Sequence, residues 1–354
     1  MATDDVPPIP HVRRKRYRGT HPRSFSDKYK ELNADEFAAD VDKVIARGQT
    51  PAGSHRSICV DEIVAILKPA PGDTVLDATL GFGGHTQELV PRVLPGGRVF
   101  SIDVDAAEIA RTEARLRKLG FAEDVLRIRQ LNFSAIGKLL EEAGGGFDCV
   151  LADFGVSSMQ LDNPARGFSY KNDGPLDLRL NQTQGEPASA LLLALSEGAL
   201  AKLFFDNADE KHAALIARQI KKSKSPINTT RQLTDVIGVA LQRMPELKHD
   251  NKTLARVFQA LRIAVNDEFG ALDRFLQKLP RVLKTGGRVA VLSFHSGEDR
   301  RVEQAFQAAF DAGVYSSIAA TPTRASPDEQ RSNPRSTSAK LRWAIRSDLS
   351  VERS

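Results

Sequence analysis

The sequence has few cysteines and no long apolar run, and each absence excludes a class of protein. Its 354 residues include two cysteines, Cys59 and Cys149, which lie far apart with no histidine at metal-ligand spacing. That pattern argues against a disulfide framework and a zinc site, so we expect no metal, and it fits a reducing cytosol. No apolar run approaches the roughly 18 residues that a membrane span needs. The charged, proline-rich start has no apolar signal segment, so we expect a cytoplasmic protein without a membrane partner.

Positive charge gathers in two stretches of the chain, although the formal net charge is only +5. Residues 11–30 contain eight arginines and lysines against one acid, Asp27, and residues 321–346 contain six against two. Clusters of this kind neutralise phosphates and release counterions, which suits a nucleic-acid partner. Solvated tails would show the same pattern, so charge alone leaves both interpretations open.

Hydrophobic patterning predicts an α/β core. Residues 1–50 are polar and basic, and we expect them to form a flexible arm. Buried-strand patterns at 73–79, 98–103, 125–130 and 147–153 then alternate with helical patterns at 86–93 and 106–119. Strands joined through helices imply right-handed crossovers and a parallel sheet.

The alternation stops after the fourth strand. Residues 161–186 have the composition of a loop, and helical periodicity follows at 188–205, 211–222, 230–243 and 254–279. A turn at 284–287 precedes a fifth strand at 288–294. We therefore expect a core of residues 51–160 and 266–354 that carries an all-helical insertion at 161–265.

A glycine-rich loop, residues 81–84, follows the first predicted strand, at the edge where open parallel sheets bind ligands. Its glycines let backbone N–H groups approach a ligand closely. Asp103 closes the second strand, where a carboxylate can accept hydrogen bonds from both ribose hydroxyls of an adenosine. Thr86 stands where the dinucleotide fingerprint requires glycine or alanine, and no P-loop motif occurs, so NAD and nucleoside triphosphates are disfavoured. S-adenosylmethionine, which has no phosphate, suits the polar groups of Gly84, His85 and Thr86; a turn that binds nothing is the alternative.

Asp153 ends the fourth predicted strand, where target chemistry is expected in this architecture. An activated methyl donor requires mainly an aligned nucleophile and one proton transfer. A carboxylate that accepts the N–H hydrogens of an exocyclic amine would return electron density to its nitrogen. Asp153 could do this, or hydrogen-bond the cofactor, or cap the following turn.

Seven separated motifs together resemble the ribosomal RNA small subunit methyltransferase H family, also called MraW-like. The resemblance covers residues 54–346 in order. It is carried by Leu-Asp-Ala-Thr-Leu-Gly-Phe-Gly-Gly-His-Thr at 76–86, Asp-Phe-Gly-Val-Ser-Ser-Met-Gln-Leu-Asp at 153–162, Arg-Gly-Phe-Ser-Tyr at 166–170, Asp-Gly-Pro-Leu-Asp-Leu-Arg at 173–179, Phe-Gln-Ala-Leu-Arg-Ile-Ala-Val-Asn at 258–266, Ser-Phe-His-Ser at 293–296, and Asn-Pro-Arg-Ser at 333–336 with Ser-Ala-Lys-Leu-Arg at 338–342.

The resemblance implies a Rossmann-like class I methyltransferase core with a mostly parallel sheet and an all-helical inserted domain that recognises substrate. It implies that S-adenosylmethionine methylates the N4 amine of a cytidine in the decoding region (P site) of 16S rRNA, within the small ribosomal subunit. DNA is not an expected partner, and a homodimer is left open. Asp153 would be catalytic, and the cofactor contacts would be Gly83, Gly84, His85, Asp103, Phe133, Asp153 and Gln160.

Residues that follow the fourth and fifth strands are candidates for the target base. Phe154, Phe168 and Tyr170 could stack on it, although aromatic side chains are more often core residues. Arg166 and Arg179 suit phosphate, and His295 could face the pocket or serve a structural role.

Some positions depart from the family's usual pattern. Asn207-Ala208 stands where a Tyr-Gly pair is common, and Gly297 replaces a leucine. Two alternatives therefore stay open: a divergent paralogue that methylates another RNA base, and a non-catalytic RNA-binding assembly factor with the same fold.

Overall fold

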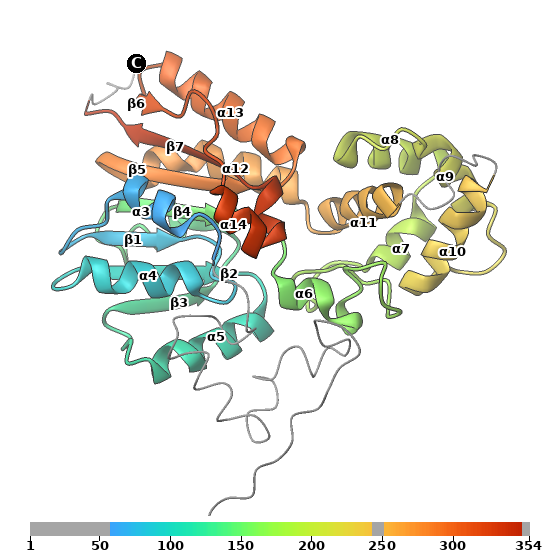
Figure 1. The fold of residues 1–354 in the computed structure, drawn as a ribbon, viewed down its shortest axis with the longest axis horizontal. Helices are drawn as coiled ribbons and strands as arrows, with labels where there is room; N and C mark the ends of the chain where they lie inside the picture. Colours follow the sequence, from blue (N-terminus) through green and yellow to red (C-terminus); the bar gives the residue numbers. More distant parts are fainter. Residues whose placement is uncertain (1–56, 243–250, 349–354) are drawn as a thin grey trace, which may run out of the picture. The chain divides into compact units, whose positions relative to one another are not determined.

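The computed structural model describes residues 57–242 and 251–348 of the chain (Figure 1). The basic arm predicted over residues 1–50 lies outside these ranges. None of the helices within them combines the length and apolarity that a membrane span requires.

One seven-stranded sheet forms the centre of the described chain, with strand order β3-β2-β1-β4-β5-β7-β6. Strands β3, β2, β1, β4 and β5 run parallel to one another. Strand β7 pairs antiparallel with both β5 and β6. The order 3-2-1-4-5 is that of a Rossmann-like sheet, which confirms the predicted fold class. The strands are β1 (Thr74–Asp77), β2 (Arg98–Asp103), β3 (Leu126–Gln130), β4 (Phe147–Asp153), β5 (Leu283–Ser293), β6 (Tyr315–Ile318) and β7 (Lys340–Arg346).

The sheet is buried on both faces because apolar side chains alternate across each strand. Val75 belongs to the hydrophobic cluster on one face and Leu76 to the cluster on the other. The residues that pair with them in β2 and β4 belong to the same two clusters. One face packs against α3 (Val60–Leu67), α4 (Gly84–Val93) and α5 (Ala106–Lys118). The opposite face packs against η2 (Phe133–Leu139), α12 (Glu268–Val282) and α13 (Ser296–Asp311).

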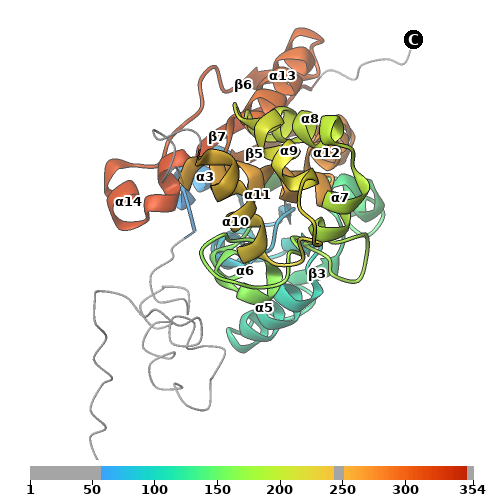
Figure 2. The same ribbon diagram turned by 90° about the vertical axis from the view of Figure 1, so that its right-hand side faces the viewer.

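The chain between β4 and β5 is helical and has a hydrophobic core of its own (Figure 2). After α6 (Ser158–Asp162) and η3 (Pro164–Arg166), this segment contains α7 (Ala188–Ala194), α8 (Glu197–Ala208), α9 (Ala213–Lys221), α10 (Thr230–Leu241) and α11 (Asn251–Val265). Phe204 of α8 and Ile216 of α9 are fully buried in this core. Each helix thus buries one apolar stripe against its neighbours.

Two segments predicted as single helices are each divided in two. Residues 188–205 divide at Ser196, whose side chain accepts the N–H of Ala199 and starts α8. Residues 254–279 divide at Asp267, which adopts the left-handed conformation with φ of 49° between α11 and α12. Strands β6 and β7, and the short α14 (Pro327–Ser332) and η5 (Pro334–Ser338) between them, follow from no pattern noted in the sequence.

Candidate active site

The glycine-rich loop joins β1 to α4, and its backbone conformation requires glycine. Gly81 and Gly83 have φ values of +46° and +71°. A Cβ on Gly83 would lie 2.8 Å from Thr112 Cγ2 and 2.9 Å from Leu116 Cδ1, both on α5. The loop is therefore drawn against α5, and the first-turn N–H groups of α4 have no acceptor within their own helix. Such an end attracts polar or negatively charged ligand groups.

Thr86 does not face this loop's open side, because its hydroxyl is fully buried beneath it. The hydroxyl donates to Asp77 Oδ2 at 2.7 Å and lies 2.8 Å from the hydroxyl of Ser101. Asp77 is 1% exposed, and burial raises the pKa of its carboxyl. The hydrogen bonds from Thr86 and from the N–H of Thr79 oppose that rise. This buried group at the end of β1 has no distinct sequence signal, since Asp77 lies within an apolar run.

Asp103, at the end of β2, fixes the glycine loop from the neighbouring strand. Its Oδ2 accepts the N–H of Gly81 at 2.9 Å, and its Oδ1 accepts the N–H of Asp105 at 3.0 Å. Burial raises the pKa of the Asp103 carboxyl, and hydrogen bonds from the N–H groups of Asp105, Gly81 and Val104 oppose the rise. A carboxylate can accept about four hydrogen bonds, so this one has capacity left for a ligand.

Asp153 and His85 face one another across the ends of β4 and α4. Asp153 Oδ2 lies 3.6 Å from His85 Nδ1, and 27% of the Asp153 side-chain surface is exposed. His85 Nε2 lies 3.0 Å from the carbonyl oxygen of Ile58, so Nε2 must carry a hydrogen. The other ring nitrogen, Nδ1, therefore faces the Asp153 carboxylate. Burial raises the pKa of Asp153 to about 6, and His85 lowers it.

Phe133 begins η2, just after β3, and packs within a group of three aromatic rings. Its ring centroid is 5.2 Å from that of Phe154 and 5.6 Å from that of Phe275. Phe154 is 6% exposed, whereas Phe133 is only half-buried. Phe133 can therefore still cover a ligand ring, while Phe154 supports it from behind.

Gln160 and Arg166 meet at Asp105, two residues beyond Asp103. Asp105 Oδ2 accepts from Gln160 Nε2 at 2.9 Å and from Arg166 Nη1 at 2.6 Å. Gln160 Oε1 accepts the N–H of Ser157 and completes a capping box at the start of α6. Asp105 itself has a sequence signal that went unused, since an aspartate just before a helical run is a common N-cap.

The remaining substrate candidates divide into buried and accessible ones. Arg166 is 5% exposed and Phe168 4% exposed, and both side chains have internal partners. Tyr170 is half-buried against Phe258, with ring centroids 6.1 Å apart. Arg179 makes a two-bond pair with Asp177, at 2.8 and 2.9 Å.

His295 caps α13 and lies among acidic groups that could suggest a metal site. Its Nε2 is 3.1 Å from Glu298 Oε1, and Glu268 completes a cluster of potential ligands. Arg262 already bonds Glu268 through two nitrogens, at 2.8 and 2.9 Å. Glu298 also accepts the N–H of Phe294. The Arg262 guanidinium thus already occupies one of the two carboxylates of this cluster.

The fold and the site together define a class I methyltransferase. The sheet has the Rossmann-like order and an antiparallel β7, the loop after β1 lacks the third glycine of dinucleotide enzymes, and acids end β2 and β4.

Comparison with known proteins narrows this class to one family. A model of the MraW methylase family matches residues 52–347. The chain is 52% identical to "Ribosomal RNA small subunit methyltransferase H 2" of Alkaliphilus metalliredigens, over 94% of this chain and 97% of the relative. It is 48% identical to "Ribosomal RNA small subunit methyltransferase H 1" of Lachnoclostridium phytofermentans, over 97% of this chain and 95% of the relative. The chain belongs to the MraW methylase family.

The buried Thr86–Asp77 bond yields a stability prediction. Thr86→Val should destabilise the protein by about 1–3 kcal/mol at a pH where Asp77 is ionised, because the buried carboxylate then loses a hydrogen-bond donor. The loss should shrink as the pH falls through the raised pKa of Asp77, since a protonated carboxyl needs that donor less. Chemical denaturation at neutral and acidic pH measures both effects. Ser101→Ala is the control, because it keeps the Asp77–Thr86 bond and should cost less; an equal cost for the two variants would contradict this assignment.

Proposed function

We propose that this protein uses S-adenosylmethionine to methylate the N4 amine of a cytidine in the decoding region (P site) of 16S rRNA. The observation that carries the proposal is the Asp153 carboxylate, partly exposed and with a pKa of about 6, at the strand end beside the glycine loop. The names of the relatives, small-subunit rRNA methyltransferases, support the choice of RNA. Such a substrate would place the reaction in the cytoplasm, with the small ribosomal subunit as partner. A homodimer remains a prediction.

The residues around the glycine loop fit this cofactor. S-adenosylmethionine supplies an electrophilic methyl group on a sulfonium when it is bound. The Asp103 carboxylate would accept hydrogen bonds from the ribose hydroxyls, and Gly83, Gly84 and His85 would present backbone groups to the amino-acid end. Phe133 would cover the adenine. We assign Gln160 a position at the edge of this site, where its bond to Asp105 holds α6 in place.

Asp153 and His85 would handle the single proton of the reaction. The ionised Asp153 carboxylate accepts an N–H hydrogen of the cytosine amine and so returns electron density to the nitrogen. When the N–CH3 bond forms, that nitrogen must lose one proton. The Asp153 carboxylate, which lies 3.6 Å from His85 Nδ1, can accept it.

The helical insertion, residues 161–265, would present the RNA. Tyr170, Arg179 and His295 retain exposed surface and are the candidates for direct contact. Phe154, Arg166 and Phe168 are buried, so we assign them to support of these contacts. The arm at residues 1–50, with its excess of arginine and lysine, would add phosphate contacts.

Mass spectrometry of 16S rRNA nucleosides tests the function. N4-methylated cytidine should disappear in a deletion strain and return with the wild-type gene but not with Asp153→Asn. Persistence at full level in the deletion strain would refute the target. Return with Asp153→Asn would refute the catalytic assignment and favour another base contact.

Asp103→Ala should weaken S-adenosylmethionine binding by about 10- to 100-fold, because charged hydrogen bonds contribute about 1.5–3 kcal/mol. RNA affinity should stay within about twofold, since Asp103 lies on the cofactor side of the loop. Calorimetry with S-adenosylmethionine and with NAD measures the first effect, and NAD should give no heat. Glu123→Ala, which removes a carboxylate 76% exposed, is the control. Equal losses of cofactor and RNA affinity would contradict the role of Asp103.

The raised pKa of Asp153 predicts an acidic limb in the pH profile. The single-turnover rate at saturating cofactor should fall below a pH of about 6, because protonated Asp153 cannot accept the amine hydrogen. His85→Gln should move this limb to higher pH, since His85 lowers the pKa of Asp153. Asp153→Asn should reduce the rate about 100- to 10,000-fold and flatten the limb. A limb that is unchanged in Asp153→Asn would show that another group titrates.

A further inference from the structure

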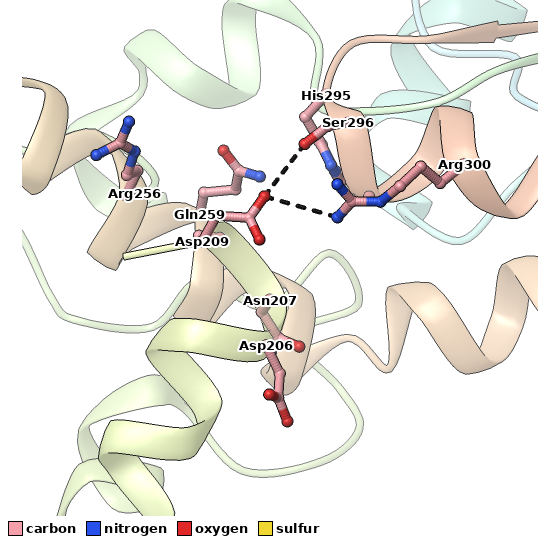
Figure 3. Close-up of a pocket in the computed structure, with 10 residues that line it drawn as sticks. Asp206, Asn207, Asp209, Arg256, Gln259, His295, Ser296 and Arg300 are labelled. Carbon is pink, nitrogen blue, oxygen red and sulfur yellow. Dashed lines mark hydrogen bonds and ion pairs between the residues drawn. The ribbon is translucent and has the colours of Figure 1, made fainter. Parts of the chain in front are cut away.

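A polar cavity of about 190 Å³ lies where α8, α11 and the start of α13 meet (Figure 3). A closed cavity of about 150 Å³ can bind benzene, so this volume has room for one base or one ribose ring. Its lining comes from the end of α8, from one face of α11, and from the turn that follows β5. The cavity is therefore built from the helical insertion and the core together.

Two arginines face the cavity from opposite sides. Figure 3 shows Arg256 of α11 on one side and Arg300 of α13 on the other, with Asp209 and Gln259 between them. Their side chains are 38% and 56% exposed, so both guanidiniums are open to an incoming ligand. A guanidinium presents a planar fork of donors that matches the geometry of a phosphate.

Acidic groups hold both arginines in place. Arg256 Nη1 lies 3.8 Å from Glu210 Oε2, and Glu210 is fully buried. Arg300 Nη2 lies 3.6 Å from Asp209 Oδ2, which also accepts a hydrogen bond from the Ser296 hydroxyl at 3.4 Å. Both distances are too long for hydrogen bonds, so the donors of each guanidinium remain available to a ligand.

The pattern of charge selects among phosphate ligands. The Asp209 carboxylate lies between the two guanidiniums, whereas Asp206, which also lines the cavity, pairs with Lys202 at 2.7 Å (Figure 3). A dense polyanion such as a triphosphate would meet the Asp209 carboxylate between the arginines. A nucleotide whose base or ribose enters the cavity has a phosphodiester on each side, and these would meet the two guanidiniums at the rim. The Gln259 amide then lies beside the nucleoside, where it could contact a base edge.

The cavity also neighbours the strand ends where Asp153 lies. Leu292 of β5 pairs with Asp153 of β4, and the cavity lining begins three residues later at His295. Glu298, bonded to His295, contributes to the raised pKa of Asp153. A single-stranded RNA whose target base is bound at Asp153 would therefore pass this cavity.

We infer that this cavity is a second nucleotide subsite for single-stranded RNA, in which Arg256 and Arg300 contact the phosphodiesters on either side of a nucleotide that flanks the target. The inference rests on the proposed function and adds a position to the substrate. It requires no methyl transfer at the cavity itself.

RNA binding by the full-length protein tests the subsite without depending on catalysis. The probe is a fluorescein-labelled single-stranded RNA with the decoding-region sequence, measured by fluorescence anisotropy over a series of salt concentrations. Arg256→Gln and Arg300→Gln should each weaken binding about fivefold at 0.1 M salt. Each should reduce the slope of log affinity against log salt by about 0.7, and the double variant by about 1.4.

Two further variants separate RNA contact from structural damage. Arg218→Gln removes an arginine with 61% exposure that pairs with Glu197 at the opposite end of α8, about 18 Å away, and should leave affinity and slope unchanged. Asp209→Asn should tighten binding a few-fold, because it removes a carboxylate beside Arg300. Asparagine tolerates the left-handed conformation of Asp209, which has φ of 50°.

The outcomes distinguish the subsite from the proposed function. Unchanged slopes in the double variant, weaker binding by Asp209→Asn, or no binding by the wild type would overturn the inference. The inference would also be overturned if wild type and double variant had equal RNA affinity once inorganic phosphate replaces chloride at equal ionic strength. That result would show that the cavity binds free phosphate. The proposed function fails separately, if N4-methylated cytidine persists in the deletion strain.

Discussion

The buried carboxylate of Asp105 joins the cofactor side of the sheet to the root of the helical insertion. It caps α5 by accepting the N–H of Ala107, and it binds both Gln160 and Arg166. Arg166 also donates to the carbonyl oxygens of Arg179 and Leu180. Asn266, at the far end of the insertion, bonds Leu178 and Leu180. One charge thereby connects the loop after β2, helix α6 after β4, and both ends of the inserted chain.

A buried ion pair of this kind is a poor source of net stability, because desolvation offsets much of its attraction. Its value lies in geometry, since each partner is costly to leave unpaired. Glu108, next to this network, shows the desolvation directly: burial raises its pKa to about 7. Ionising Glu108 therefore costs folding free energy as the pH rises from its ordinary pKa of 4.5 towards 7. The bond between Asp105 and Gln160 joins the loop after Asp103 to helix α6, which follows Asp153 in the chain.

The sequence predicted the sheet, and the position of Gly83, Asp103 and Asp153 at its edge, because both follow from local rules. The apolar runs that became β1, β2, β3 and β4 are short and bounded by polar residues, and ligands of such sheets bind at one edge. Gly83, Asp103 and Asp153 were placed at this edge from position alone. Thr86 was correctly used against a dinucleotide site, but its hydroxyl serves Asp77 beneath the loop. The helix breaks at Ser196 and Asp267 were missed, because periodicity continues across them while a cap or a left-handed residue ends the helix.

The substrate side was harder to predict because burial there depends on distant partners. Arg166 pairs with Asp105, which lies 61 residues earlier in the chain. No local sequence pattern distinguishes such a buried, paired arginine from one that binds phosphate. Arg256 and Arg300 lay outside every motif considered, yet their guanidiniums remain exposed. The buried Arg166 and the exposed Arg256 and Arg300 suit two different roles. Arg166 fixes the orientation of the helical insertion, whereas exposed positive charge attracts and aligns a flexible RNA strand. We therefore regard position in the fold, rather than arginine content, as the feature that separates structural from RNA-facing residues in this protein.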